Sequence, residues 1–446
     1  MDTKSRRSKR LRLLILGGLA VFLIWEVTTR GLASYLAESN PEASLRLRAG
    51  NPRAVLNLIQ TKLDEAQQQA RKQSSQGAQS SSFYPAGLDV RGAAQIRRWA
   101  EAVLRNDPLN SEALRVLGQL SDGATDKNET RRLMQAAVRR SIHESIAVYY
   151  MMQDSYFRRD YEAALRYADV LLRTRLQVAD QVMPMLGALA ENREGSSKLK
   201  QLLATNPPWR GQFFGSLPSV ITDARTPLDF LLSVRENGST PPTAGELSPY
   251  IKFLLDHGLF DLAYYAWLQF LPNEQLNQAG HLFNGSFELE PSGAPFDWQF
   301  SQDTGATTKI ASRPDDVAKH ALFMQFGPGR AEFQGVRQLL MLSPGSYILK
   351  GQYKLDLISP RGLQWRITCA RATEPLAVSS LHNGRVPDWS NFDVEFTVPS
   401  QNCPAQTLEL VSAARSASEQ FMTGTAWYDD LLISSAVQPQ TSERSQ

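Results

Sequence analysis

The spacing of hydrophobic positions changes once along this chain. Between residues 32 and 272, apolar residues recur every three or four positions without sustained alternation, as in amphipathic helices. After residue 273 the period becomes two, for example in segments 347–353 and 392–398, and turn sequences separate the segments. The sequence therefore predicts a multidomain protein in which an all-α domain precedes an all-β domain, whose many short strands are typical of a sandwich.

The helical part contains a repeat. One constant shift aligns Asp107 with Ser141 and Ala113 with Ala147, and a second shift of nearly the same size brings Thr174 into register. The shift matches the length of a tetratricopeptide repeat. The helical part thus resembles tetratricopeptide-repeat proteins, and the resemblance implies helical hairpins that bind a protein partner.

Two polar stretches interrupt the helical pattern. Residues 67–82 are rich in Gln and Ser and indicate a flexible insertion, and residues 237–246 indicate a linker or long loop. The last ten residues are polar, and we expect them to be disordered. The expected divisions are an anchor with its basic flank, a helical repeat domain, a β-sandwich and a tail, at residues 1–30, 31–273, 274–436 and 437–446.

The N-terminus has the pattern of a membrane signal. Six basic residues and Asp2 give the first twelve residues a charge of +5, and an apolar run then extends from Leu13 to Trp25. This is a signal peptide or a signal anchor. Because no small-x-small cleavage site follows promptly, we favour an uncleaved single-pass anchor. The positive-inside rule then predicts a bacterial inner-membrane protein with most of the chain in the periplasm.

The remaining charge excludes one class of partner. The whole chain has a formal charge of +3, so the residues after the basic flank sum to about −2. That balance does not support a nucleic-acid-binding surface.

The only two cysteines, Cys369 and Cys403, both lie at strand-like segments of the β-rich part. An exported compartment would permit them to form a disulfide. Alternatively, they are two buried thiols that never meet.

The β-rich part resembles the carbohydrate-binding jelly rolls of the galactose-binding-like superfamily over residues 281–434, about a third of the chain. The residues that carry this resemblance occur in the family's order: Asn284-Gly-Ser-Phe-Glu288, Trp298, 321–326, 342–347, 389–399 and Ala426-Trp-Tyr-Asp-Asp430. The resemblance implies a module that binds glycans, although such a fold can also bind proteins or be structural.

The same resemblance implies a structural calcium ion. In families of this type, a glutamate after the glycine turn and an aspartate near the end of the module often hold the metal, which corresponds here to Glu288 and Asp430, with Asp429 as an alternative. Two carboxylates with backbone carbonyls would suit calcium chemically. In the alternative interpretation, Glu288 makes only hydrogen bonds and Asp430 closes a turn.

Sugar binding uses exposed aromatic rings beside polar groups. The family usually buries the positions of Trp298, Trp389 and Tyr347. Trp365 and Tyr353, with Arg366 beside them, are therefore the predicted glycan-binding residues.

No catalytic centre is recognisable. The five histidines form no metal-binding pair or nucleophile motif, and the glycine-rich segment 326–330 follows a strand and opens no helix, so it is a turn. We expect a non-enzymatic, periplasm-facing scaffold or adaptor in cell-surface polysaccharide production or export. The alternatives are a polysaccharide-modifying enzyme with its site in the β-module loops, and a purely structural assembly factor.

Overall fold

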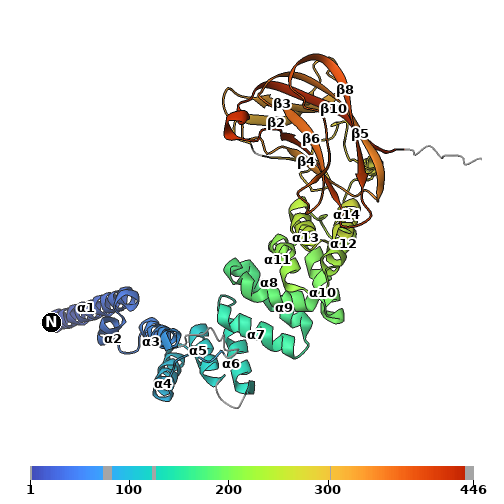
Figure 1. Ribbon diagram of the computed structural model, residues 1–446. Coiled ribbons are helices and arrows are strands. Elements are labelled where there is room, and N and C mark those ends of the chain that lie inside the picture. Colours follow the sequence, from blue (N-terminus) through green and yellow to red (C-terminus); the bar gives the residue numbers. More distant parts are fainter. Residues whose placement is uncertain (1–2, 74–82, 123–126, 302, 437–446) are drawn as a thin grey trace, which may run out of the picture. The chain divides into compact units, whose positions relative to one another are not determined.

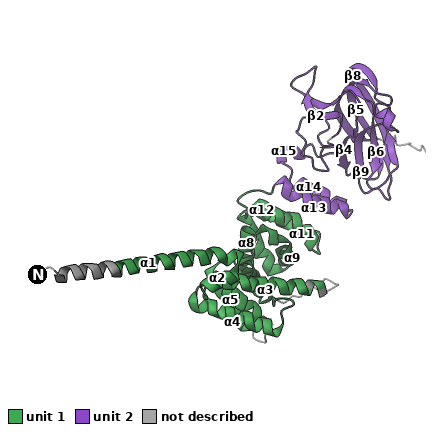
Figure 2. Ribbon diagram, turned by 90° about the vertical axis from the view of Figure 1, so that its left-hand side faces the viewer, with its two compact units in different colours: residues 1–242 green, residues 243–446 purple. Residues whose placement is uncertain are grey.

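The computed structural model describes residues 3–73, 83–122, 127–301 and 303–436, with side chains from Leu16 onward except those of Arg71 and Gln73. The chain forms two compact units, Met1–Pro242 and Thr243–Gln446 (Figures 1 and 2). The predicted tail at 437–446 and the basic side chains before Leu13 lie outside the described residues.

Unit 1 begins with a long helix, α1 (Thr3–Ser39), followed by α2 (Pro41–Leu47) and α3 (Pro52–Gln73). In the described part of the chain, Leu16–Ser39 is long and apolar enough to cross a membrane by length and composition, a test that signal sequences also pass. Residues 67–73 of the expected flexible insertion are helical, because α3 continues to Gln73. Residues 74–82 lie outside the described part.

The rest of unit 1 consists of helices that pack on their neighbours in the chain. They are α4 (Val90–Asn106), α5 (Ser111–Ser121), α6 (Lys127–Arg140), α7 (Ser145–Phe157), α8 (Tyr161–Thr174), α9 (Ala179–Ala190), α10 (Arg193–Ala204), α11 (Arg210–Val220) and α12 (Thr226–Asn237), with a 3₁₀ turn at Leu176–Val178. Helices α5, α7 and α9 start at equal intervals along the chain. The equivalent residues Ala113 and Ala147 are fully buried, which allows neighbouring helices to approach closely.

Charged side chains join successive helix pairs in unit 1. Arg115 of α5 bonds Glu144 at the start of α7, with 3.1 Å between Nε and Oε2. Arg131 of α6 holds the Asp154 carboxylate of α7 with two nitrogens, at 2.7 and 2.8 Å. Both arginines therefore fix the position of α7, which belongs to the following pair.

Unit 2 starts with α13 (Ala244–Asp256), α14 (Phe260–Gln269) and the short α15 (Asn273–Leu276). Thr243, just before α13, and Glu246 in its first turn form a capping box. The unit boundary therefore differs from the expected boundary at 273/274. The reason is aromatic packing: Trp267 of α14 contacts Phe283 and Phe296 of the sandwich, with ring centroids 5.2 and 5.6 Å apart.

The remainder of unit 2 is the predicted antiparallel sandwich (Figure 1). One sheet has the order β1-β4-β9-β6-β7 and the other β2-β3-β10-β5-β8. The strands are β1 (Gln299–Phe300), β2 (Ala306–Ser312), β3 (His320–Phe326), β4 (Val336–Leu340), β5 (Gly345–Ile358), β6 (Leu363–Cys369), β7 (Pro375–Val378), β8 (Gly384–Val398), β9 (Gln406–Ser412) and β10 (Thr423–Ser435), with a 3₁₀ turn at Ala417–Gln420. We call the sheet that contains β1 the β1 sheet and the sheet that contains β2 the β2 sheet.

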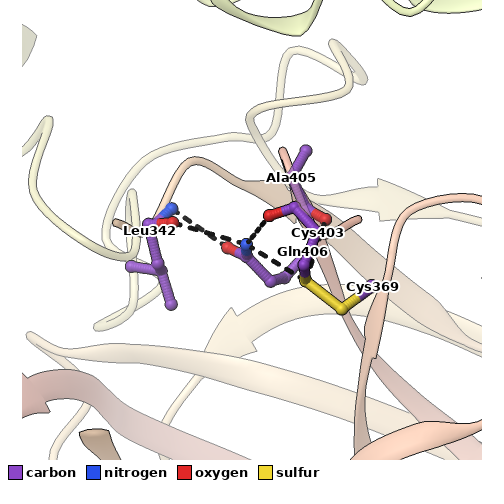
Figure 3. Close-up of a disulfide and its surroundings, with 5 residues drawn as sticks. All are labelled: Leu342, Cys369, Cys403, Ala405 and Gln406. Carbon is purple, nitrogen blue, oxygen red and sulfur yellow. Dashed lines mark hydrogen bonds between the residues drawn. A yellow bond between two sulfur atoms is a disulfide. The ribbon is translucent and has the colours of Figure 1, made fainter. Parts of the chain in front are cut away.

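A disulfide joins Cys369, the last residue of β6, to Cys403, just before β9, with Cα atoms 5.1 Å apart. The fully buried Gln406 lies beside it (Figure 3). The Gln406 side chain accepts the backbone N–H of Leu342 at 3.0 Å and donates to the carbonyl of Cys403 at 3.1 Å. These bonds satisfy polar groups that the apolar core could not.

Candidate functional site

The alternation along β6 places two predicted glycan-binding residues on opposite faces of the β1 sheet. Trp365 is 0% exposed and packs edge-on against Tyr428, with centroids 5.5 Å apart. Its ring is inside the sandwich and cannot stack on a sugar, so this prediction is wrong. Successive strand residues point to opposite faces, and Arg366 accordingly lies on the outer face.

Tyr353 also points inward. Its ring stacks on the buried His382 at a centroid distance of 4.2 Å and packs against the sandwich core. Residues 349, 351, 355 and 357 on the same face of β5 are buried. Tyr353 is therefore partly buried against the core, and His382 covers one face of its ring.

Arg366 belongs to a polar row across the outer face of the β1 sheet. The strand register aligns Gln299 with Arg337, Arg337 with Glu409, and Glu409 with Arg366. Arg366 contacts Glu409 at 2.7 Å, and Arg337 donates to Gln299 at 3.1 Å. Each charge in this row therefore has a neighbour with which it interacts.

A pocket of about 410 Å³ lies where α13 meets this face. Its lining combines sheet residues such as Arg337, Gln299 and Thr407 with Lys252 and Asp256 of α13. The size is within the usual range for small-molecule sites. Its lining contains polar groups that could bind hydroxyls, but no aromatic ring.

The outer face of the β2 sheet carries an aromatic pair that the sequence analysis did not select. Phe323 of β3 and Trp427 of β10 are register partners with centroids 4.4 Å apart. Both are partly exposed. The register extends the row on either side, with Lys309 of β2 next to Phe323 and Lys354 of β5 next to Trp427.

Polar side chains flank this pair on the same face. Gln325 and Thr425 are register partners one row away, and Gln352 of β5 lies in the row on the other side. None of the three is buried. The face therefore presents apolar rings between lysines, with amide and hydroxyl groups close by and the exposed Asp356 carboxylate next to Thr425. We call Phe323, Trp427, Lys309 and Lys354 the aromatic row.

An ion-pair cluster stands beside the aromatic row. Arg313 contacts the buried Asp429 at 2.7 Å and Asp315 at 2.9 Å, and its guanidinium lies 4.2 Å from the centroid of the Trp389 ring. Hydrogen bonds from Arg313 and Trp389 hold the pKa of Asp315 far below its usual value. Burial raises the pKa of Asp429 to about 6. Trp389 is consequently engaged with Arg313 rather than buried in the core.

The predicted calcium ligands are at one end of the β2 sheet. Glu288 accepts the backbone N–H of His320 at 3.2 Å, and the Nδ1 atom of His320 lies 3.0 Å from the other carboxylate oxygen. Tyr428 pairs with Leu322, so Asp430 and His320 belong to the same end of these strands. Arg313 already neutralises Asp429, which makes Asp429 the poorest of the three candidates.

The described residues contain no group of three or more His, Cys, Asp or Glu side chains that could hold a metal ion. Any calcium site at Glu288 and Asp430 would thus need backbone carbonyls or water for most of its six to eight ligands. Calcium stays a prediction for experiment.

Comparisons with known proteins give distant matches. No protein-family model matches the sequence, and no curated protein matches it. Among solved structures, the chain is similar to a family 4 carbohydrate-binding module (16% identity, TM-score 0.27, 35% of this chain and 99% of that one). It is also similar to a family 16 module (16%, 0.25, 35% and 99%) and to a xylan-binding domain from Paenibacillus barcinonensis (14%, 0.23, 33% and 90%). At these identities, function must be inferred from this chain's own residues.

Proposed function

We propose that this protein is a non-enzymatic, membrane-anchored scaffold whose β-sandwich binds polysaccharide through the aromatic row. The observation that carries the proposal is the Phe323–Trp427 pair, two partly exposed rings in contact on the outer face of a sheet. Exposed aromatic faces supply apolar area for the CH groups of a pyranose ring, and they need little ordering on binding because they have few rotatable bonds.

The lysines in the row favour an acidic glycan. Lys309 and Lys354 flank the two rings in register, and the Lys309 ammonium lies 5.7 Å from the Phe323 centroid. A sugar stacked on Trp427 or Phe323 would place a carboxylate or similar anion within reach of one of them. Gln325, Thr425 and Gln352 could exchange hydrogen bonds with hydroxyl groups.

The other parts of the chain supply the scaffold in this proposal. The apolar segment of α1 would anchor the protein in the bacterial inner membrane, with both units in the periplasm. The helical pairs of unit 1, in which α5, α7 and α9 start at equal intervals, would act as tetratricopeptide-like repeats that recruit a protein partner. Such a protein would serve cell-surface polysaccharide production or export.

A carbohydrate microarray that holds neutral and acidic polysaccharides tests the proposal. The full chain, in detergent, should bind selected acidic glycans, and Trp427→Ala should weaken binding at least tenfold, a loss of about 1.4 kcal/mol. Lys354→Ala should reduce binding to acidic glycans more than to neutral ones. Arg337→Ala, on the outer face of the other sheet, is the matched control and should bind normally.

Two results would contradict the proposal. If Arg337→Ala abolishes glycan binding and Trp427→Ala does not, the site is the pocket under α13 and the aromatic row is structural. If folded wild-type protein binds no glycan on the array, glycan binding is not the role of the sandwich.

A further inference from the structure

The turn between α2 and α3 concentrates exposed arginines next to the apolar helix. Arg46 and Arg48 precede the turn and Arg53 follows it, and all three are exposed. Leu47 between them is 43% exposed. Among the side chains that the structure describes, no carboxylate forms an ion pair with any of these arginines. We call Arg46, Leu47, Arg48 and Arg53 the arginine turn.

Hydrogen bonds fix the direction of α2 and α3 along α1. Ser44, in the middle of α2, donates to the carbonyl of Ala33 at 2.6 Å, although α2 begins only after α1 has ended at Ser39. Helix α2 therefore runs back along α1 toward the apolar segment. Asn51 donates to the same Ala33 carbonyl at 3.0 Å, and Asn57 donates to Ala37 at 2.7 Å, so α3 runs the other way.

The arginine turn is consequently the part of the α2–α3 pair nearest to the apolar segment. It lies beyond the level of Ala33, close to that of Arg30. Arg30 is five residues after Trp25, where the apolar run ends, which corresponds to roughly 7 Å of helix. The polar layer of a bilayer is roughly 5–8 Å thick on each side of the hydrocarbon core. If the hydrocarbon core ends where the apolar run ends, at Trp25, the turn lies at the depth of the lipid headgroups.

Basic and acidic residues are unevenly distributed along the hairpin of α1 and α2. Arg30 and the arginines of the turn lie toward the apolar segment, where Glu26 of α1 forms an ion pair with Arg30. Glu38 and Glu42, by contrast, lie where α1 ends and α2 begins, at the opposite end, and both are exposed. The acidic residues keep the net charge on this side low, so the more basic N-terminal flank still determines the expected orientation.

We propose that the arginine turn binds the anionic headgroups of the bilayer surface and holds the first helices of unit 1 against the membrane. The proposal rests on the membrane anchor of the proposed function. Each basic residue near an anionic leaflet strengthens binding by roughly fivefold, and Leu47 would enter the interface between the arginines. The tight packing of α2 and α3 on α1 leaves no flexible linker that could move the turn away.

Hydrogen exchange of the full chain in lipid nanodiscs tests this inference. Discs of phosphatidylcholine alone are compared with discs that contain about 30% phosphatidylglycerol, a composition chosen to give a strongly anionic surface. Amides of residues 41–53 should exchange at least fivefold more slowly in the anionic discs, and high salt should remove the difference because it screens the headgroups.

Charge-reversal variants identify the residues responsible. R46E/R48E/R53E should exchange equally fast in both kinds of disc. R132E/R139E/R140E reverses three exposed arginines of α6, is the matched control, and should behave like the wild type.

The possible failures are distinguishable. A chain that enters discs of both compositions but exchanges equally in them overturns the lipid-binding inference and leaves the anchor intact. Wild-type protein that enters neither kind of disc overturns the anchor, and the inference with it. Glycan binding by the sandwich is unaffected by either result.

Discussion

Loss of the Cys369–Cys403 disulfide should destabilise the sandwich by an amount that its loop length determines. The two cysteines are 34 residues apart. Closure of such a loop lowers the conformational entropy of the unfolded chain, which stabilises the folded state by about 4 kcal/mol in the chain-entropy model. For a unit of this size, each kcal/mol changes the melting temperature by about 2–4 °C. We therefore expect C369A/C403A to lower the melting temperature of the sandwich by about 8–16 °C.

The measurement must separate the sandwich from unit 1, because a protein with two units need not unfold in one step. Native-state hydrogen exchange of the full chain does this, with β6 and β9 peptides reporting on the sandwich and α7 and α8 peptides serving as an internal control. Wild-type protein treated with a reductant is the matched comparison, since it retains both sulfur atoms and forms no cavity. The β6 and β9 opening free energy should fall by about 4 kcal/mol in both samples, and the α7 and α8 values should stay constant.

Two results would refute this reasoning. If reduction changes the opening free energy of β6 and β9 by less than about 1 kcal/mol, the loop contributes no useful restriction and the unfolded chain is already compact there. If only the alanine variant is destabilised, the effect comes from lost packing around two buried side chains.

Two further predictions concern titration and calcium. Burial lowers the pKa of His382 from 6.5 to about 4, so between these pH values the unfolded chain binds a proton that the folded chain excludes. The free energy of unfolding should therefore fall by about 3 kcal/mol between pH 6.5 and 4. In urea unfolding curves, His382→Gln should remove that loss, whereas parallel pH profiles of variant and wild type would exclude His382 as its source. If Glu288 and Asp430 hold calcium, the wild type should melt at a higher temperature with calcium than with chelator, and Glu288→Ala should abolish the difference. Identical wild-type melting curves with calcium and with chelator would exclude calcium binding.

Much of the architecture could be predicted from periodicity. The change from a three-to-four spacing to a spacing of two located the sandwich, because each secondary structure imposes its own repeat on buried positions. The end of the helical domain was less predictable. Trp267 reads as an ordinary helical core residue, and only the fold reveals that its partners are Phe283 and Phe296 of the sandwich.

The candidate site shows how far strand alternation could have been used. Trp365 and Arg366 are neighbours in one strand, so they could not both face the same ligand. The same rule marks Trp427 as outward, because Ala426 and Tyr428 on either side of it are buried. Its contact with Phe323 could not be read from the sequence, since it depends on which strands pair and in what register.

The docking of α13 and α14 on the sandwich also defines what can be inherited or exchanged as a module. A gene fusion that began at residue 274 would separate Phe283 and Phe296 from Trp267 and leave two large rings in water, a hydrophobic patch that favours aggregation. A fusion that began at Thr243 would keep the capping box of α13 and the aromatic contacts of α14 together. Any natural recombination that moved this sandwich between proteins should therefore have carried the two helices with it.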